Sequence, residues 1–237
     1  RRSPVLEISG LNTYYGRAHI LSDLSLNVQR GEVVALLGRN GAGKSTTLKS
    51  INGLVRPTSG NIIFENQSLN HQTPHIACRR GIGYVPEERR IFTDLTVMEN
   101  LEVGTRPSHE GLTAWTLERI FHIFPNLAEM RNRPGGQMSG GEQQMLTIAR
   151  TLIGNPKLIL LDEPSEGLAP VIVQQMTATI QELKREGLTI ILSEQNLRFA
   201  TKLADRVYII EKGHIRYEGT MKDLAEDEDV RNAYLTV

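Results

Sequence analysis

The strongest chemical signal in this sequence is a glycine-rich stretch, GRNGAGKS, at Gly38–Ser45. It fits the pattern G-x-x-x-x-G-K-[ST], in which backbone amides surround the β- and γ-phosphates of a nucleotide. Lys44 supplies a positive charge, and the hydroxyl of Ser45 can ligate Mg²⁺. The pattern predicts a site for a nucleoside triphosphate with Mg²⁺, formed by Gly38, Arg39, Asn40, Gly41, Ala42, Gly43, Lys44 and Ser45.

Two adjacent acids supply the chemistry that the glycine-rich stretch lacks. Asp162 and Glu163 follow the apolar residues 158–161 in LILLDEP. At this place Asp162 can hold Mg²⁺ directly or through water, and Glu163 can orient or deprotonate an attacking water. The alternative is a helix-capping pair beside Pro164. Their position at the carboxyl end of a predicted strand, where open α/β sheets bind ligands, favours the catalytic interpretation.

A second stretch, MSGGEQQMLTIAR at Met138–Arg150, also predicts an anion site. Ser139, Gly140 and Gly141 open an amphipathic helix, and a helix N-terminus favours a negative charge. This stretch has no lysine, so it would contact a γ-phosphate only as a supplement. If it lies too far from Lys44 within the chain, it must serve the nucleotide of another subunit.

Short apolar strands alternating with helices would position these groups. VVALLG at Val33–Gly38 is typical of a buried parallel strand, and it leads into a helix that ends near Gly53. The alternation predicts right-handed crossovers and a parallel sheet. Further predicted elements are strands at 62–64, 81–86, 158–162, 189–193 and 206–210, a helix from Pro170, and edge strands at 5–8 and 24–28 joined through a turn at Tyr14–Gly16.

Residues 96–153 show helical spacing with no strand between the helices, which indicates a helical insertion. LTAWTLERIFHIF, which begins at Leu112, is one of the predicted helices. We therefore interpret 1–237 as a single domain, with a core formed by 1–80 and 155–237 and a helical subdomain at 88–153 that carries the second anion motif.

Composition excludes several other classes of protein. The formal net charge is zero, because there are 27 lysines and arginines and 27 aspartates and glutamates. Nucleic acid is therefore not the expected partner, although this balance does not exclude a local basic patch. No apolar run approaches the roughly 18 residues of a membrane-spanning helix. A membrane would then be met through another protein. The single cysteine excludes an intramolecular disulfide and fits a reducing compartment.

GRNGAGKST, MSGGEQQ and LILLDEP, in this order, resemble the nucleotide-binding subunit of an ABC transporter over essentially the whole chain. The resemblance implies an α/β fold of the P-loop NTPase class, with a mostly parallel sheet core, an antiparallel β subdomain and a helical subdomain. It implies hydrolysis of ATP with Mg²⁺ and a head-to-tail dimer that encloses two ATP molecules. The residues that would contact the partner's ATP are Ser139, Gly140, Gly141 and Glu142.

The same resemblance assigns three further positions. Tyr15 stands where the family places an aromatic residue that stacks on adenine, with Tyr14 as a competitor, and Thr46 joins the nucleotide-binding residues. SEGLAP at Ser165–Pro170 occupies the segment that contacts the opposite protomer.

Two residues depart from the usual family pattern. Glu87 replaces a glutamine that senses Mg²⁺, and a carboxylate can still ligate the ion while adding negative charge. Gln195 replaces a histidine that contacts the γ-phosphate; its amide can donate a hydrogen bond but cannot shuttle a proton. Glu163 must then activate water without a histidine, which leaves the turnover rate in question. In the alternative interpretation, Gln195 is a polar residue at a strand end.

YVPE, MSGGEQQM, SEGLAP followed by VIVQQM, and SEQN resemble the LivF-type ATPases of branched-chain amino-acid importers more closely. This resemblance implies a second ATPase subunit of the LivG type or a second copy of the chain, two membrane permease subunits, and indirectly a substrate-binding protein. It implies a peripheral position on the cytoplasmic face of a bacterial or archaeal cell membrane. Arg89 and Arg90 lie where the family meets its membrane subunit, but they could equally be solvated surface charges.

Four other functions are alternatives to a branched-chain amino-acid importer. Urea and short-chain amide importers use similar ATPases. An export or lipid-transport ATPase would be expected to keep glutamine and histidine at positions 87 and 195. A soluble ABC protein of translation or DNA repair would show fused halves, coiled coils or basic arms. A non-catalytic regulatory module is disfavoured by Glu163 but not excluded, because of Gln195.

Overall fold

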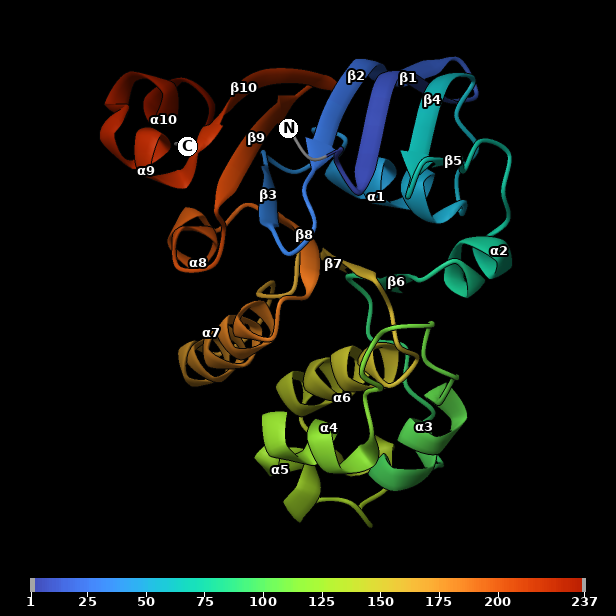
Figure 1. Cartoon of the computed structure of the whole chain (residues 1–237). Helices are drawn as coiled ribbons and strands as arrows, with labels where there is room; N and C mark the ends of the chain where they lie inside the picture. Colours follow the sequence, from blue (N-terminus) through green and yellow to red (C-terminus); the bar gives the residue numbers. More distant parts are fainter. Residues whose placement is uncertain (1–2, 236–237) are drawn as a thin grey trace.

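The computed structural model describes residues 3–235, which form two β-sheets and surrounding helices (Figure 1). The smaller sheet has the strand order β2-β1-β4-β5 and is antiparallel. Its strands are β1 (Leu6–Tyr15), β2 (Ala18–Val28), β4 (Ser59–Phe64) and β5 (Gln67–Ser68). The larger sheet contains β3 (Val33–Leu37), β6 (Ile82–Val85), β7 (Leu158–Asp162), β8 (Thr189–Glu194), β9 (Arg206–Glu211) and β10 (His214–Thr220).

The larger sheet has the order β10-β9-β3-β8-β7-β6, and all its neighbouring strands are parallel except β10, which runs antiparallel to β9. The predicted mostly parallel sheet is therefore confirmed. Its register pairs Leu37 with Glu194, and Ser193 with Asp162. Because these strands end at the same edge of the sheet, the residues that follow β3, β7 and β8 converge there.

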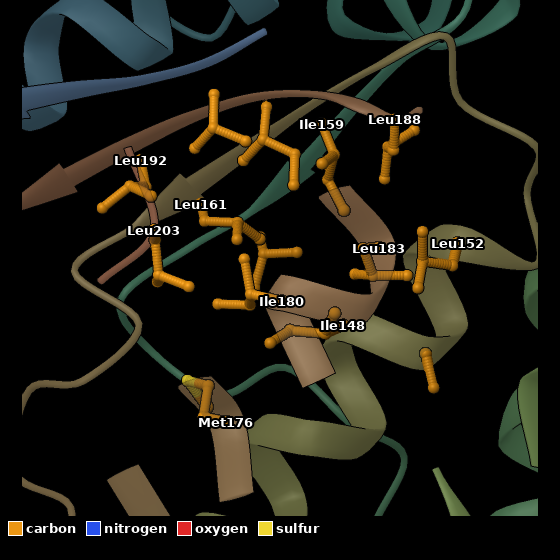
Figure 2. Close-up of a cluster of buried hydrophobic side chains, with 14 of the residues drawn as sticks. Ile148, Leu152, Ile159, Leu161, Met176, Ile180, Leu183, Leu188, Leu192 and Leu203 are labelled. Atoms are coloured by element: carbon orange, nitrogen blue, oxygen red, sulfur yellow. The ribbon is translucent and has the colours of Figure 1, made fainter. Parts of the chain in front are cut away.

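Strands β3, β7 and β8 of the larger sheet are buried on both faces, which explains their continuous apolar runs. In β3, Val33, Ala35 and Leu37 face one hydrophobic cluster, and Val34 and Leu36 face another. The first cluster contains side chains from α6 (Gly140–Leu152) and α7 (Pro170–Arg185). Figure 2 shows strand residues Ile159, Leu161 and Leu192 facing helix residues Ile148, Leu152, Ile180 and Leu183.

The second cluster places a different helix on the opposite face. Leu48 and Ile51 of α1 (Lys44–Asn52) pack there together with side chains of the antiparallel sheet. The helix that follows the glycine-rich stretch and the helix that carries the second anion motif thus lie on opposite faces of the larger sheet (Figure 1).

Between β6 and β7 the described chain contains helices and no strand, as the pattern of residues 96–153 predicted. One predicted helix is wrong in extent, since the segment from Leu112 becomes helical only at Leu117. Thr116 accepts a hydrogen bond from the backbone N–H of Arg119 at 3.2 Å and caps the helix there. The helices of this part are α3 (Val97–Gly104), α4 (Leu117–Ile123), α5 (Pro125–Glu129), the 3₁₀ turn η1 (Gly135–Gln137) and α6.

The prediction that β1 is a short edge strand is also wrong. β4 pairs with the other side of β1, so β1 lies inside the antiparallel sheet. Pairing with β2 continues to Tyr15 opposite Ala18, so Tyr14 and Tyr15 belong to the strand, and the turn lies at Gly16–Arg17. The remaining helices are α2 (Pro74–Arg79), α8 (Leu197–Thr201), α9 (Met221–Glu226) and α10 (Glu228–Tyr234).

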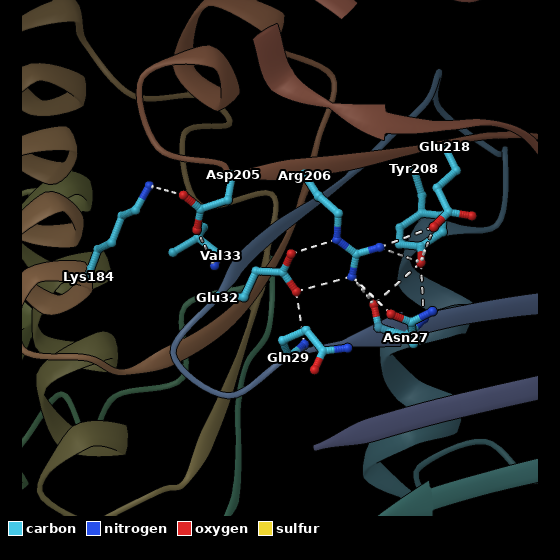
Figure 3. A network of polar contacts seen from close by, with 9 residues as sticks. All are labelled: Asn27, Gln29, Glu32, Val33, Lys184, Asp205, Arg206, Tyr208 and Glu218. Carbon is cyan, nitrogen blue, oxygen red and sulfur yellow. Dashed lines mark hydrogen bonds and ion pairs between the residues drawn. The ribbon is translucent and has the colours of Figure 1, made fainter. Parts of the chain in front are cut away.

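A polar network around Arg206 of β9 joins the two sheets (Figure 3). Its guanidinium donates to the carboxylate of Glu32 at 2.5 Å and to the carbonyl of Asn27, in β2, at 2.7 Å. It also donates to Tyr208 and Glu218, each at 3.1 Å. Hydrogen bonding to Glu32 raises the pKa of Arg206 above its ordinary value. The network fixes the antiparallel sheet against the strands that carry the site.

We expect Glu32→Gln to lower the free energy of unfolding by about 1–2 kcal/mol, because it removes the charge that balances a largely buried arginine. Urea unfolding followed by circular dichroism measures this loss. The network lies at the amino-terminal end of β3, so the kcat of any nucleotide hydrolysis should change less than twofold. A loss below about 0.5 kcal/mol would show that the network does not hold the sheets together.

Candidate nucleotide site

The glycine-rich stretch forms a tight turn between β3 and α1. Gly43 has a φ of 112°, and a Cβ there would lie 2.8 Å from the side chain of Leu21. The conformation and the packing both require glycine at this position. The turn buries Lys44, whose Nζ donates to the carbonyls of Gly38 at 2.6 Å and Arg39 at 2.9 Å. The loop thus wraps around its own lysine.

Lys44 also forms an ion pair with Glu163, in which Nζ and Oε1 lie 3.1 Å apart. The side chains are 4% and 8% exposed, so each buried charge needs the other as a partner. The glycine-rich stretch and the acid pair, separated by more than one hundred residues, are therefore brought together as the sequence predicted. A phosphate that approached Lys44 would compete with this carboxylate for the ammonium group.

Asp162 is held by three hydroxyl groups. Ser45 and Tyr84 donate to its Oδ2 at 2.7 and 3.0 Å, and Ser193 donates to its Oδ1 at 2.7 Å. Burial, followed by the charge of Asp162, raises the pKa of the Tyr84 hydroxyl above its ordinary value, so the hydroxyl keeps its proton and donates. A carboxylate and a serine hydroxyl in contact are hard oxygen donors that fit Mg²⁺.

Sequence reasoning missed Tyr84 and Ser193. A polar side chain in each of two otherwise apolar strands, GIGYVP and TIILS, was the available signal. Their common partner could not be found without the register that places β8 beside β7.

Glu163 and Gln195 meet above the sheet edge. Gln195 donates from Nε2 to Asn40 at 2.6 Å and to Glu163 Oε2 at 3.4 Å. Glu163 adopts a φ of 45°, and its backbone N–H donates to the hydroxyl of Ser193 at 3.0 Å. A non-glycine residue in this left-handed region is disfavoured, so the surrounding contacts must hold it. Three predicted site residues, Asn40, Glu163 and Gln195, are thus in one cluster.

Glu87 lies within the electrostatic field of the acid pair. Partial burial raises the pKa of its carboxyl above the ordinary value, and the charges of Glu163 and Asp162 raise it further. Among the described contacts, Glu87 makes no hydrogen bond with Ser45 or Asp162. Its role as a Mg²⁺ ligand stays a prediction.

The two tyrosines before Gly16 differ in their surroundings. The ring of Tyr14 stacks on His19, with centroids 4.2 Å apart and planes at 5°. Tyr15 is 48% exposed, and its hydroxyl accepts from Thr46 at 3.3 Å, which places it beside the start of α1. Tyr15 therefore has a ring face available for a nucleobase near the predicted phosphate site, whereas one face of Tyr14 is occupied.

The second anion motif starts α6 with a capping box. The hydroxyl of Ser139 accepts from the N–H of Glu142 at 3.2 Å, and Glu142 Oε1 accepts from the N–H of Ser139 at 2.9 Å. A Cβ at Gly141 would lie 2.5 Å from Ile172 of α7, and one at Gly140 would lie 2.4 Å from the guanidinium of Arg89. Packing against α7 therefore requires glycine at position 141, whereas the flexible Arg89 side chain could move away from a Cβ at position 140.

A family model described as ABC transporter matches residues 21–166. The chain belongs to the ABC transporter family. It is an ATP-binding and ATP-hydrolysing subunit, as the resemblance implied.

The high-affinity branched-chain amino acid transport ATP-binding protein BraG of Pseudomonas aeruginosa is 45% identical to this ABC ATPase over 231 residues, covering 98% of this chain and 99% of BraG. The lipopolysaccharide export system ATP-binding protein LptB of Escherichia coli is 38% identical over 229 residues, covering 94% and 92%. An ATP-binding cassette of an ABC transporter, solved in its ADP conformation, matches with a TM-score of 0.83 and 28% identity over 98% of both chains.

We expect Tyr15→Ala to weaken ATP binding about tenfold, because stacking on a base contributes roughly 1–3 kcal/mol. Tyr14→Ala is the matched control and should change the affinity less than twofold. Titration of each variant with a fluorescent ATP analogue measures both effects. A larger loss in Tyr14→Ala than in Tyr15→Ala would reverse the assignment.

Proposed function

We propose that this ABC ATPase energises the uptake of leucine, isoleucine and valine through partner membrane subunits. The observation that carries the proposal is the 45% identity with BraG over nearly the whole of both chains. The 38% identity with LptB supports the same catalytic activity, with lipopolysaccharide export as the second candidate. Glu87 and Gln195 favour the importer, since an exporter would be expected to keep glutamine and histidine there. A urea or short-chain amide importer is the alternative within the importer class.

In the proposed mechanism, the buried Lys44–Glu163 pair exchanges partners when ATP binds. The γ-phosphate replaces Glu163 as the ion-pair partner of the Lys44 ammonium group. The carboxylate of Glu163 then becomes free to accept a hydrogen bond from water. Glu163 then orients this water for in-line attack and takes its proton. Gln195 donates its amide N–H toward the γ-phosphate and moves no proton.

Mg²⁺, held by Ser45 and Asp162 with Glu87 nearby, would neutralise charge on the phosphate oxygens. The three hydroxyl groups around Asp162 orient its carboxylate for this task. Buried oxygen donors of this kind support the assignment of ATP with Mg²⁺ as the substrate complex.

The proposed working unit is a dimer in which Ser139, Gly140, Gly141 and Glu142 face the ATP of a second subunit. The separation of α1 and α6 on opposite faces of the larger sheet supports this arrangement (Figure 1). The capping box presents the N-terminus of α6 with its backbone held in place. The second subunit is a LivG-like ATPase or another copy of this chain. ATP stabilises the closed dimer, and hydrolysis removes those contacts.

A groove of about 360 Å³ is the proposed contact surface for a permease subunit at the cytoplasmic face of the membrane. Arg90, Arg106 and Arg150 line it together with Leu54. The guanidinium of Arg150 lies 5.3 Å from the ring centroid of Phe92, which is 50% exposed. This mixture of cations and apolar surface fits an amphipathic helix with an acidic residue. None of the helices within residues 3–235 combines the length and hydropathy needed to cross a bilayer.

Glu163→Gln should lower the rate of ATP hydrolysis at least about 100-fold, because the proton acceptor is lost. ATP should stay bound, because the lysine is retained. Light scattering should then find a dimer with Mg-ATP and a monomer with ADP. Lys44→Ala in the same background is the control and should stay monomeric. A monomer of Glu163→Gln at saturating Mg-ATP would exclude a homodimer and direct the search to a LivG-like partner.

Glu163→Gln at the gene's own locus should abolish uptake of labelled leucine, isoleucine and valine, since transport requires ATP hydrolysis. Uptake of labelled urea and the amount of lipopolysaccharide at the cell surface should stay unchanged. Loss of urea uptake with normal leucine uptake would establish the alternative importer. A defect confined to lipopolysaccharide would establish the exporter.

A further inference from the structure

Glu194, the last residue of β8, is a buried acid that the mechanism above does not use. It is 2% exposed, and among the described contacts it forms no ion pair. Its Oε1 accepts a hydrogen bond from the backbone N–H of Ser165 at 3.0 Å, and its Oε2 accepts one from the N–H of Asn196 at 3.4 Å. One carboxylate thus bridges two loops that follow different strands.

The first loop carries the catalytic glutamate. Glu163 has a φ of 45°, a conformation that residues with a β-carbon rarely adopt. β8 holds this backbone at two points, because Ser193 accepts from the N–H of Glu163 and Glu194 accepts from the N–H of Ser165. The backbone N–H of Glu166 closes the turn by donating to the carbonyl of Glu163 at 3.1 Å.

The second loop carries Gln195. This residue lies between Glu194 and Asn196, so the hydrogen bond from the N–H of Asn196 fixes the backbone on both sides of it. The amide of Gln195 in turn contacts Glu163 Oε2. We propose that Glu194 is a positioning residue that holds Glu163 and Gln195 in their mutual arrangement by bridging the backbone amides of Ser165 and Asn196. This inference rests on the catalytic roles proposed above for these two residues.

Protonation of Glu194 should weaken the bridge. Burial raises the pKa of Glu194 to about 7, the hydrogen bonds from Ser165 and Asn196 oppose this change, and the charge of Glu163 adds to it. Glu163 is itself paired with Lys44. A carboxyl oxygen that carries a proton is a weaker hydrogen-bond acceptor than a carboxylate oxygen. The bridge is therefore strongest when Glu194 is ionised, and it weakens as the pH falls through about 7.

The test compares Glu194→Gln and Glu194→Asp with the wild-type chain. The glutamine keeps one acceptor and turns an NH₂ group toward the other backbone amide, and the aspartate keeps the charge on a shorter side chain. Each variant should lower kcat for ATP about tenfold, with KM changed less than twofold, because positioning of the reacting groups is lost. In the wild type and in Glu194→Asp, kcat should decrease as the pH falls below 7. In Glu194→Gln, this decrease should be absent.

Glu32→Gln is the matched control, since it removes a largely buried carboxylate that precedes β3, at the opposite end of this strand from the glycine-rich stretch. It should lower the melting temperature and leave kcat and its pH profile unchanged. The proposal is overturned if both Glu194 variants keep kcat within twofold of the wild type, or if the pH profile of Glu194→Gln superimposes on that of the wild type. If Glu194→Gln does not fold, an unchanged kcat in Glu194→Asp overturns it alone.

The outcome is independent of the dimer proposed above. ATP-dependent dimers of Glu163→Gln together with wild-type kcat in the Glu194 variants would refute only the positioning role. Strict monomers together with a reduced kcat in those variants would refute only the homodimer.

Discussion

The site depends first on the parallel register of β3, β8 and β7 at their carboxyl ends. This register places Leu37 beside Glu194, and Ser193 beside Asp162. Each strand continues directly into a loop of the candidate site, so a slip of β7 by one residue would move the side chain of Asp162 to the opposite face of the sheet, away from Ser193. The apolar residues on both faces prevent such a slip, because helices cover both. Hydrophobic packing on the two faces of the sheet therefore fixes the positions of the charged groups at its edge.

Burial at this edge makes each charge depend on a specific partner. Lys44 and Glu163 neutralise each other, and Asp162 is surrounded by hydroxyl donors. Burial raises the pKa of Glu194 to about 7, and the hydrogen bonds that it accepts from backbone amides oppose this rise. Such a set of groups is stable only while every partner is present, and in the proposed mechanism it rearranges when a phosphate becomes the partner of Lys44.

The residues of the second anion motif have structural roles within this chain. Gly141 has no side chain because Ile172 of α7 occupies that space, and Glu142 completes the capping box with Ser139. A capping box accepts glutamate or glutamine at the position that Glu142 occupies. Packing and capping therefore explain these residues even without the ATP of a second subunit.

The sequence by itself determined the motifs, the parallel sheet and the helical segment between β6 and β7, because local spacing and apolar runs carry that information. It also placed the phosphate loop and the acid pair in one site, since both follow buried strands. Only the tertiary structure showed the different surroundings of Tyr15 and Tyr14, and only it connected Tyr84 and Ser193 with Asp162. It also placed β1 inside its sheet and showed the bridge made by Glu194. These features depend on the order and register of strands far apart in the chain, and no local pattern of residues encodes which strands become neighbours.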